Sequence, residues 1–511
     1  MTMMGSALTN SDAVRTQAER RSADARWAPS GASLALLVPV VLLYWQLGGP
    51  SSLLTDPNTG VHVRTGEWIL AQHVVPRKDL FSFAVGGHPW CDWEWLTDTL
   101  YALLHRWRGL AAIAAFSLAV LCLTSLLVYF TARVHAGRIV AFAVACLVMA
   151  TTTIHWLARP HLLTWLLVAL FCWVIERARV NSNGAPLLAL PLLMVPWVNL
   201  HPGFLAGVLI LTVWGAAEHV EGLLGLTQVG HIVAVHWSRW FSLTALACLA
   251  ATLVNPYGIE LHKHIVEYLF SPNTVTAQVA EWLSPDFHNP RLHWFELLLP
   301  LAAAAGLWHG LRGRLAWCAL TLGGMHLALA SVRNVPIFAI LCAAPVSSLV
   351  EHLVQRCGLR ERFHAAEGSL ASSALTTLTG YCVVAVFVIA VGCQAVLGLG
   401  TPSSLPVEAI AHLPPGRLFT TDRWADYVIY AEPRRQVFFD CRNDVYGPDF
   451  LKEYITVIRA EPGWQGIAAK YAFAVALVPD RSPLSAALAA SADWRLSYRD
   501  ATAAVFVRQQ L

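Results

Sequence analysis

The chain has 511 residues, of which 56% are hydrophobic and only 13% are charged, with a formal net charge of +3. Soluble globular proteins carry about 25% charged residues, so this composition excludes an ordinary soluble protein. The small net charge, without a basic stripe, excludes a nucleic-acid partner, and eleven scattered cysteines without a CxxC motif indicate neither a zinc site nor a disulfide framework.

Apolar runs long enough to cross a bilayer recur along the chain and predict a mainly α, polytopic membrane protein. In chain order we expect about eleven transmembrane helices, at 31–48, 109–132, 138–154, 161–177, 185–199, 203–220, 240–255, 292–310, 315–331, 334–353 and 374–398. The transmembrane domain is therefore expected to cover residues 31–400.

Arginines set the expected orientation. Four of them, Arg15, Arg20, Arg21 and Arg26, lie in the polar tail 1–30, which we take as cytoplasmic. Further arginines then fall in the short loops on the same side. The long segments 50–108 and 256–291, and everything after residue 400, are expected on the outer side.

The outer loop 50–108 concentrates carboxylates, histidine and tryptophan in an otherwise apolar chain. Asp56 precedes an amphipathic stretch, about Thr59 to Val74, that is typical of a helix lying in the membrane interface. A carboxylate at this depth can take a proton from an acceptor hydroxyl beside a lipid-linked phosphate. The alternative role of Asp56 is to cap the helix, just as Asp92 could cap a helix that begins near Trp93.

Polar residues also gather at the outer ends of five predicted spans. They are His155, Arg159 and His161, then Asn199 and His201, then Asn255 and Tyr257, then Glu281, Trp282 and Asp286, then Arg333 and Asn334. Ionisable groups at membrane depth usually face a cavity or a partner, so we predict one shared cavity covered by the loop 50–108. Taken singly, a tryptophan at a span end is better explained as an interfacial anchor. The asparagines are equally well explained as turn residues, and the arginines as snorkelling flanks.

Residues 401–511 differ in composition and predict a small soluble α/β domain on the outer side. We expect strands at 417–421, 437–440 and 473–478, helices at 450–460 and 484–490, and a final hairpin of 494–498 and 503–508 with its turn at Asp500. Polar residues of this domain, from Arg423 to Tyr446, either help close the cavity or serve the turns of the domain itself.

Several motifs together resemble the GT-C class of polyprenyl-phosphate-dependent glycosyltransferases, and a bacterial membrane-protein group within it. They are Asp56 with His62, Pro76/Asp79/Phe81/Ser82, Glu94-Trp95-Leu96, Arg159-Pro160-His161, residues 197–203, Asn255-Pro256-Tyr257-Gly258, Glu281-Trp282 and residues 440–447. The Asp-Glu pair of protein mannosyltransferases is Asp56-Pro57 here, and the Trp-Trp-Asp signature of oligosaccharyltransferases is absent, so the acceptor class stays open.

The resemblance implies a multi-pass protein of the bacterial plasma (inner) membrane, with a periplasmic C-terminal domain. It would transfer a hexosyl or pentosyl group from a polyprenyl-phosphate donor to a glycan, lipid or protein acceptor. Asp56 carries over as the catalytic carboxylate. The substrate-binding candidates are His62, Trp90, Asp92, Trp93, Glu94, Arg159, His161, Asn199, His201, Asn255, Tyr257, Glu281, Trp282 and Arg333.

Within this set, Arg159, His161, His201 and Arg333 are expected to bind the lipid phosphate, and Trp90, Trp93 and Trp282 to stack on the sugar or acceptor. No metal ligand is assigned, because Asp56, His62, Asp92 and Glu94 have ligand chemistry without a diagnostic spacing; a divalent cation stays open. The alternative function is a non-enzymatic envelope scaffold with a lipid-binding cavity. A transporter is disfavoured by the lack of inverted repeats.

Overall fold

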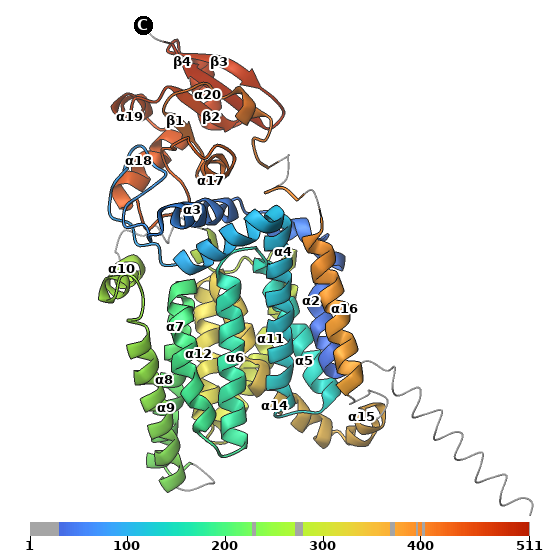
Figure 1. Cartoon of the computed structure of the whole chain (residues 1–511). Helices are drawn as coiled ribbons and strands as arrows, with labels where there is room; N and C mark the ends of the chain where they lie inside the picture. Colours follow the sequence, from blue (N-terminus) through green and yellow to red (C-terminus); the bar gives the residue numbers. More distant parts are fainter. Residues whose placement is uncertain are drawn as a thin grey trace, which may run out of the picture.

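A bundle of long helices carries a smaller domain at one end (Figure 1). The structure, a computed structural model, describes residues 30–226, 231–270, 280–367, 374–394, 397–400 and 404–509. The expected cytoplasmic tail 1–30 therefore lies outside the described residues except for Ser30.

Helices occupy all eleven segments in which transmembrane helices were predicted. In chain order they are α2 (Gly31–Trp45), α4 (Trp95–Arg133), α5 (Arg138–Thr152), α6 (His161–Val180), α7 (Ala189–Leu200), α8 (Leu205–Leu223), α9 (His231–Ala251), α11 (His293–Gly310), α12 (Leu315–Ala330), the pair α13 (Val335–Leu341) and α14 (Ala343–Arg356), and α16 (Ala374–Gly392). Helix α9 begins well before the predicted residue 240.

Length and apolar composition qualify five helical segments as candidate membrane spans. They are Trp95–Arg133, Arg138–His155, His161–Val180, Pro202–Leu223 and His231–Ala251, and the pair α13–α14, bent by 53°, makes a sixth if it is one span. Large apolar side chains, among them Leu243 and Leu246 of α9 and Val386 and Ile389 of α16, are exposed on the bundle, as lipid contact requires. The multi-pass architecture is confirmed, while the number of eleven spans stays a prediction.

The first outer loop is more helical than the sequence indicated. The predicted amphipathic helix is α3 (Asn58–Gln72), and it lies across the end of the bundle beside the first part of α4 (Figure 1). Helix α4 runs for 39 residues but leaves helical geometry at Arg108 and Gly109, where Gly109 has a φ of 65°. At this break α4 turns from the end of the bundle into its interior.

Short helical turns close the outer ends of the bundle. They are η1 (Pro50–Leu54), η2 (Thr153–His155), η4 (Pro202–Phe204), η5 (Ala280–Trp282), η6 (Pro290–Leu292) and η7 (Val332–Asn334), together with the helix α10 (Ile259–Phe270), which the sequence did not predict. At the opposite end lie η3 (Ala185–Leu188) and α15 (Arg360–Glu367).

The C-terminal domain has a four-stranded sheet in the order β1-β2-β4-β3, in which only the β1–β2 pair is parallel. Its elements are η8 (Ala409–His412), β1 (Leu418–Thr420), α17 (Asp422–Ala431), α18 (Pro448–Ile458), α19 (Trp464–Lys470), β2 (Val475–Pro479), α20 (Pro483–Ala490), β3 (Trp494–Arg499) and β4 (Ala503–Arg508). The α/β class and the final hairpin are confirmed, with Asp500 accepting backbone N–H bonds at the turn. Helices α17 and α19 were missed.

The predicted strand 437–440 is wrong. Val437 makes only isolated parallel bridges, one to Ser82 of the first loop and one to Leu418. The Ser82 hydroxyl donates to the Phe438 carbonyl at 3.0 Å. The backbone hydrogen bonds of this segment therefore join the domain to the loop. Its apolar side chains, which had suggested a strand, pack in the aromatic core around Phe419 and Phe473.

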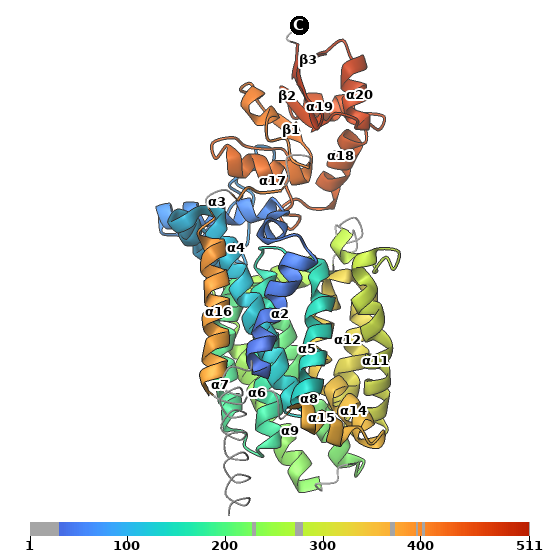
Figure 2. The same ribbon diagram turned by 90° about the vertical axis from the view of Figure 1, so that its right-hand side faces the viewer.

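The domain rests on the first loop and on the start of α4 (Figure 2). Helix α17 packs on α3, where a Cβ at Gly60 would come within 2.5 Å of Tyr430. Asn58 donates from its side chain to Asp426 at 3.1 Å, and Arg423 donates to the Thr55 carbonyl at 2.6 Å. The residues on either side of Asp56 are therefore held between the bundle and the domain.

Candidate active site

Asp56, Arg159 and Glu281 form an ion-pair cluster at the end of the bundle that carries the C-terminal domain. One guanidinium nitrogen of Arg159 lies 3.2 Å from Asp56 Oδ2 and 2.9 Å from Glu281 Oε1. The other oxygen of Asp56 accepts the Asn58 N–H at 3.0 Å. The three side chains are 21 to 27% exposed, so the cluster is sheltered but open to a ligand.

Backbone contacts fix the three segments that carry this cluster. The Ala158 N–H donates to the Leu53 carbonyl at 2.7 Å, and the Thr59 hydroxyl donates to the Ala158 carbonyl at 2.9 Å. These bonds fasten the turn before Arg159 to chain on both sides of Asp56. The Ser331 hydroxyl donates to the Glu281 carbonyl at 3.0 Å, which fastens the third segment to η7.

The opposite charges of the cluster stabilise one another in their ionised forms. Burial alone would raise the pKa of Glu281, but Arg159, His155 and Arg333 outweigh it and lower that pKa to about 2. Burial would lower the pKa of Arg159, but Glu281 and Asp56 raise it above the usual arginine value. Glu281 is thus a carboxylate and Arg159 a cation at neutral pH.

Arg333 is the cation of this end that keeps its hydrogen-bonding groups free. Its guanidinium lies over the Trp282 ring, 5.2 Å from the ring centre, and makes no hydrogen bond to any described residue. The Trp282 ring contacts Tyr268, and Tyr268 contacts Trp93. A wall of three aromatic rings therefore runs beside a cation that can bind an anion.

Glu94 lies between two histidines at the start of α4. Its oxygens are 3.8 Å from His62 Nε2 and 3.4 Å from His201 Nε2. Nδ1 of His201 accepts the Gly203 N–H at 2.9 Å, so the proton of neutral His201 is on Nε2, facing Glu94. Burial raises the pKa of Glu94, against His62, Arg159 and Arg333.

His62 presents one unused ring nitrogen. Its Nδ1 lies 2.8 Å from Asp98 Oδ1, while its buried Nε2 has no hydrogen-bond partner among the residues that the structure describes. Burial, with Arg159 and against Glu94 and Asp56, lowers the pKa of His62 to about 4. A neutral imidazole with a free nitrogen can accept a hydrogen bond from a substrate hydroxyl or a water.

The lowered pKa of His62 predicts a loss of stability in mild acid. The unfolded chain takes up a proton at the ordinary histidine pKa of about 6.5 and the folded chain only at about 4, so stability falls as pH drops through this window, by up to about 3 kcal/mol. We expect His62→Asn, which keeps a donor toward Asp98, to lose less thermal stability than the wild type between pH 6.5 and 4.

Thermal unfolding in detergent at a series of pH values measures this effect. The control is His288→Asn, since His288 is 98% exposed and should unfold with the pH dependence of the wild type. Equal acid sensitivity of the wild type and His62→Asn would contradict the prediction.

Several other predicted residues already have complete sets of partners. The side chain of Asn199 bonds to Trp95 Nε1 and to the carbonyls of Val195 and Val254, and that of Asn255 closes its own turn. The Tyr257 hydroxyl joins the Pro76 carbonyl to the Asp92 N–H. These three residues hold the loop in place, and their role in substrate binding stays a prediction.

Three other predicted substrate-binding residues are buried and do not face a surface groove. They are Trp90, His161 and Asp92. Trp90 is buried under the guanidinium of Arg442, 4.6 Å from its ring centre. His161 Nε2 lies 3.0 Å from the His155 carbonyl. Asp92 is buried, and burial raises its pKa well above the usual value, with Asp98 and Glu94 adding to the effect. Of the three predicted stacking tryptophans, the structure brings together Trp93 and Trp282.

Sequence reasoning missed three residues of this site, and it placed His155 at a span end without giving it a role. His155 lies 3.8 Å from Glu281, and Asp98 holds His62. His264, on α10, contacts the Trp93 ring and lies 3.3 Å from Asp444 of the C-terminal domain. Tyr268, also on α10, joins Trp93 to Trp282. The only sequence signal for these residues was the His-Lys-His run at 262–264, which is typical of an exposed helix surface.

No group of three or more His, Cys, Asp or Glu side chains positioned to hold a metal ion occurs among the described residues. The two carboxylates of the ion-pair cluster, Asp56 and Glu281, both face Arg159. A divalent cation would therefore have to displace the guanidinium from at least one of them.

No family model and no curated protein matches the chain. Among solved structures it is similar to the oligosaccharyltransferase of Archaeoglobus fulgidus, at 12% identity. The apo form gives a TM-score of 0.55 over 88% of this chain and 69% of that one. The complex of archaeal oligosaccharyltransferase AglB with an inhibitory peptide and a dolichol-phosphate gives 0.57 over the same shares. The likeness shows that the two chains share a fold.

Proposed function

We propose that this chain is a membrane glycosyltransferase that moves a sugar from a polyprenyl-phosphate donor to an acceptor on the outer face of the membrane. The observation that carries the proposal is the meeting of Asp56, Arg159 and Glu281 at one end of the bundle, beneath the C-terminal domain. The fold is shared with an oligosaccharyltransferase whose structure holds a dolichol-phosphate, which supports a lipid-linked donor.

In the proposed reaction, an acceptor oxygen bonds to the anomeric carbon of the sugar while the bond from that carbon to the phosphate oxygen breaks. The phosphate leaves with the electron pair, and the acceptor proton passes to Asp56 Oδ2. Arg159 holds that carboxylate in place through its 3.2 Å contact. Arg333, whose guanidinium is free of hydrogen bonds to described residues, stabilises the charge that grows on the departing phosphate.

The aromatic wall of Trp93, Tyr268 and Trp282 offers faces on which a sugar or acceptor can stack, and His62 Nε2 offers a hydrogen-bond acceptor. We place the soluble domain 401–511 on the periplasmic side of a bacterial inner membrane, with the tail 1–30 in the cytoplasm. The arginine distribution of the sequence supports this orientation.

The direct test uses the purified full-length chain in detergent with a panel of short-chain polyprenyl-phosphate hexoses and pentoses. We expect acceptor-dependent release of polyprenyl phosphate from at least one donor. Parallel reactions with a chelator and with added Mg²⁺ or Mn²⁺ determine whether a divalent cation takes part. A folded protein that binds every donor of the panel but releases no phosphate with any glycan, lipid or peptide acceptor would sink the proposal.

Arg333→Gln is expected to lower kcat/KM for the donor by about 10- to 100-fold, because the variant loses a charged contact to the phosphate. Inhibition by the product polyprenyl phosphate should weaken in parallel. The matched control is Arg291→Gln, an exposed arginine of η6, which should leave both quantities unchanged. Unaltered product inhibition in Arg333→Gln would remove Arg333 from the phosphate site.

A further inference from the structure

A polar cavity lies at the end of the bundle remote from the C-terminal domain. It has a volume of about 340 Å³ and lies among the ends of α6, α8, α9 and α12. Val180 and Val233, which line it, are 56% and 38% exposed, so the cavity opens to the outside of the bundle. None of its residues takes part in the candidate active site.

The walls of this cavity are charged and aromatic. Glu176, Glu218 and Glu221 supply three carboxylates, against the two guanidinium groups of Arg179 and Arg314. Trp214, Trp237 and Trp317 form the apolar walls. The excess of one carboxylate over the arginines favours a ligand that carries a positive charge.

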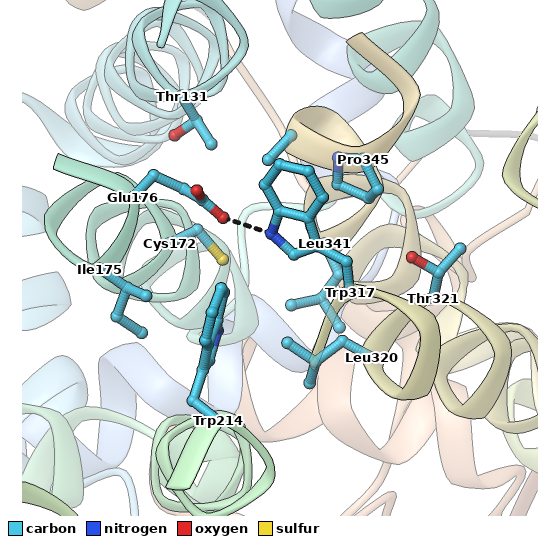
Figure 3. Close-up of a pocket in the computed structure, with 11 residues that line it drawn as sticks. Thr131, Cys172, Ile175, Glu176, Trp214, Trp317, Leu320, Thr321, Leu341 and Pro345 are labelled. Atoms are coloured by element: carbon cyan, nitrogen blue, oxygen red, sulfur yellow. Dashed lines mark hydrogen bonds between the residues drawn. The ribbon is translucent and has the colours of Figure 1, made fainter. Parts of the chain in front are cut away.

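Most of these charged groups already have partners inside the protein. Figure 3 shows the Glu176 carboxylate directed at the indole N–H of Trp317, at 2.7 Å, and its other oxygen lies 2.8 Å from His135 Nε2. Glu221 accepts the Leu315 N–H at the start of α12, at 2.7 Å. Glu176 and Glu221 thus serve the packing of the helix ends.

Glu218 and Arg314 are different. One oxygen of Glu218 pairs with Arg179 at 2.7 Å, but its buried Oε2 has no hydrogen-bond partner among the described residues, although the side chain is only 2% exposed. An unsatisfied buried carboxylate oxygen costs free energy unless a donor fills the place. The Arg314 guanidinium lies over the Trp317 ring at 5.2 Å and makes no hydrogen bond to the part of the chain that the structure describes.

We propose that this cavity binds a phosphate ester that carries a primary ammonium group. The ammonium group donates to Glu218 Oε2, the phosphate pairs with Arg314, and Trp214 and Trp237 pack on the short carbon link between them. Such a group is the headgroup of an ethanolamine phospholipid or a free phosphoethanolamine. The cavity size suits a headgroup and excludes anything much larger.

The first experiment is native mass spectrometry of the purified full chain in detergent with equal amounts of phosphatidylethanolamine, phosphatidylcholine and phosphatidylglycerol. We expect about tenfold stronger retention of the ethanolamine lipid than of the choline lipid. Both carry the same phosphate, but a quaternary ammonium cannot donate a hydrogen bond to Glu218. The glycerol lipid, which lacks the positive charge, should also be retained less.

Glu218→Gln tests the contact itself. Its carbonyl oxygen can still accept from Arg179, but its amide N–H₂ meets the ammonium group, so the preference for ethanolamine should fall to within about twofold. Arg314→Gln should weaken the ethanolamine and choline lipids alike and preserve their ratio, because both lipids carry the phosphate. Glu260→Gln is the control, since Glu260 is an exposed glutamate on α10 at the other end of the bundle.

Displacement distinguishes the two sources of the ligand. If millimolar phosphoethanolamine displaces the lipid, the headgroup alone carries the affinity; if it does not, the acyl chains contribute and the ligand is a membrane lipid. A wild type that retains ethanolamine and choline lipids equally would overturn the proposal. So would a Glu218→Gln variant that keeps the wild-type preference, while a misfolded variant would be recognised by loss of all three lipids.

Discussion

Replacing Asp56 by asparagine is expected to lower kcat for sugar transfer about 10²- to 10⁴-fold. The amide keeps the shape of the side chain and can still accept the Asn58 N–H, but it cannot take the proton of the acceptor. Arg159 would keep its 2.9 Å contact with Glu281, so the phosphate side of the site should survive. The expected result is therefore a loss of kcat with a donor KM close to that of the wild type.

The structure gives Asp56 two roles that this experiment must separate. One oxygen accepts a backbone N–H at the start of α3, and the other faces Arg159. Asp56→Ser can still accept the Asn58 N–H, as Asp56 does, but has no carboxylate. We expect Asp56→Ser to unfold near the wild-type temperature and to be as inactive as Asp56→Asn.

The assay is acceptor-dependent release of polyprenyl phosphate, measured under single-turnover conditions. Asp449→Asn is the control, since Asp449 is 93% exposed on α18 and should show full activity. If Asp56→Asn and Asp56→Ser both transferred sugar at the wild-type rate, the assigned role of Asp56 would fall, and His62 Nε2 would become the next candidate proton acceptor.

Glu281 is a positioning residue in this scheme, and the variant Glu281→Gln tests that role. Glu281→Gln weakens the hold on Arg159, so Arg159 can pair more closely with Asp56. We expect a smaller loss of kcat, about tenfold, together with a shift of the pH profile. A merely structural role would lower the amount of folded protein and leave the pH profile unchanged.

Much of the fold could be predicted because a membrane helix requires a long apolar run, which is visible in the sequence. Helices occupy all the predicted segments, and α3 follows the amphipathic stretch that was identified ahead of it. Helix α9 shows the limit, since polar residues such as His236 and Arg239 concealed its first two turns. Those side chains line a separate pocket beside Trp240, and polar residues of this kind interrupt the apolar run by which a membrane helix is recognised.

The grouping of the site could be predicted only in part. Topology places Asp56, Arg159, Glu281 and Arg333 at the same end of the bundle, because each lies next to an outer span end. Which of them touch depends on turns such as η2 and η5, whose geometry is set by hydrogen bonds between distant segments. Helix α10 has an amphipathic pattern that was overlooked in the sequence, whereas the contact between Asp98 and His62 leaves no local signal.

The contact between the loop and the domain was the least predictable feature. The sequence suggested that polar residues near Asp440 belonged either to the cavity or to the turns of the domain. In the structure Arg442 joins Asp79 of the loop to Asp440 of the domain, at 2.6 and 2.7 Å. The two aspartates are more than 360 residues apart in the chain, and a pairing over that distance leaves no local signal.

Arg442→Gln is therefore expected to have the second large effect, a loss of about 3–5 kcal/mol from the stability of the loop–domain contact. Asp79 and Asp440 are fully buried, and removing the guanidinium leaves both carboxylates without their cation. The variant also loses the stacking of Arg442 on the rings of Phe81 and Trp90, at 4.8 and 4.6 Å.

Hydrogen exchange and limited proteolysis of the purified chain measure this loss. We expect faster exchange in residues 76–95, including the Phe83 N–H that donates to the Val437 carbonyl, and at the Val437 N–H that donates to the Phe81 carbonyl. We expect little change in α4 after Gly109. The control is Arg495→Gln, an exposed arginine of β3, which should alter stability by less than about 0.5 kcal/mol.

The rate of sugar transfer should also respond to Arg442→Gln, because the same loop carries Asp92, Trp93 and Glu94 into the candidate active site. If the Arg442 network holds this loop in position, Arg442→Gln should lower the transfer rate and raise exchange in the loop together, and Arg442→Lys should restore part of both through its charge. A variant with a released loop and undiminished transfer would show that the reaction requires Asp56 and Arg159 but not the docked domain. Since Asn58 and Thr55 also contact the domain on either side of Asp56, we expect the two effects to appear together.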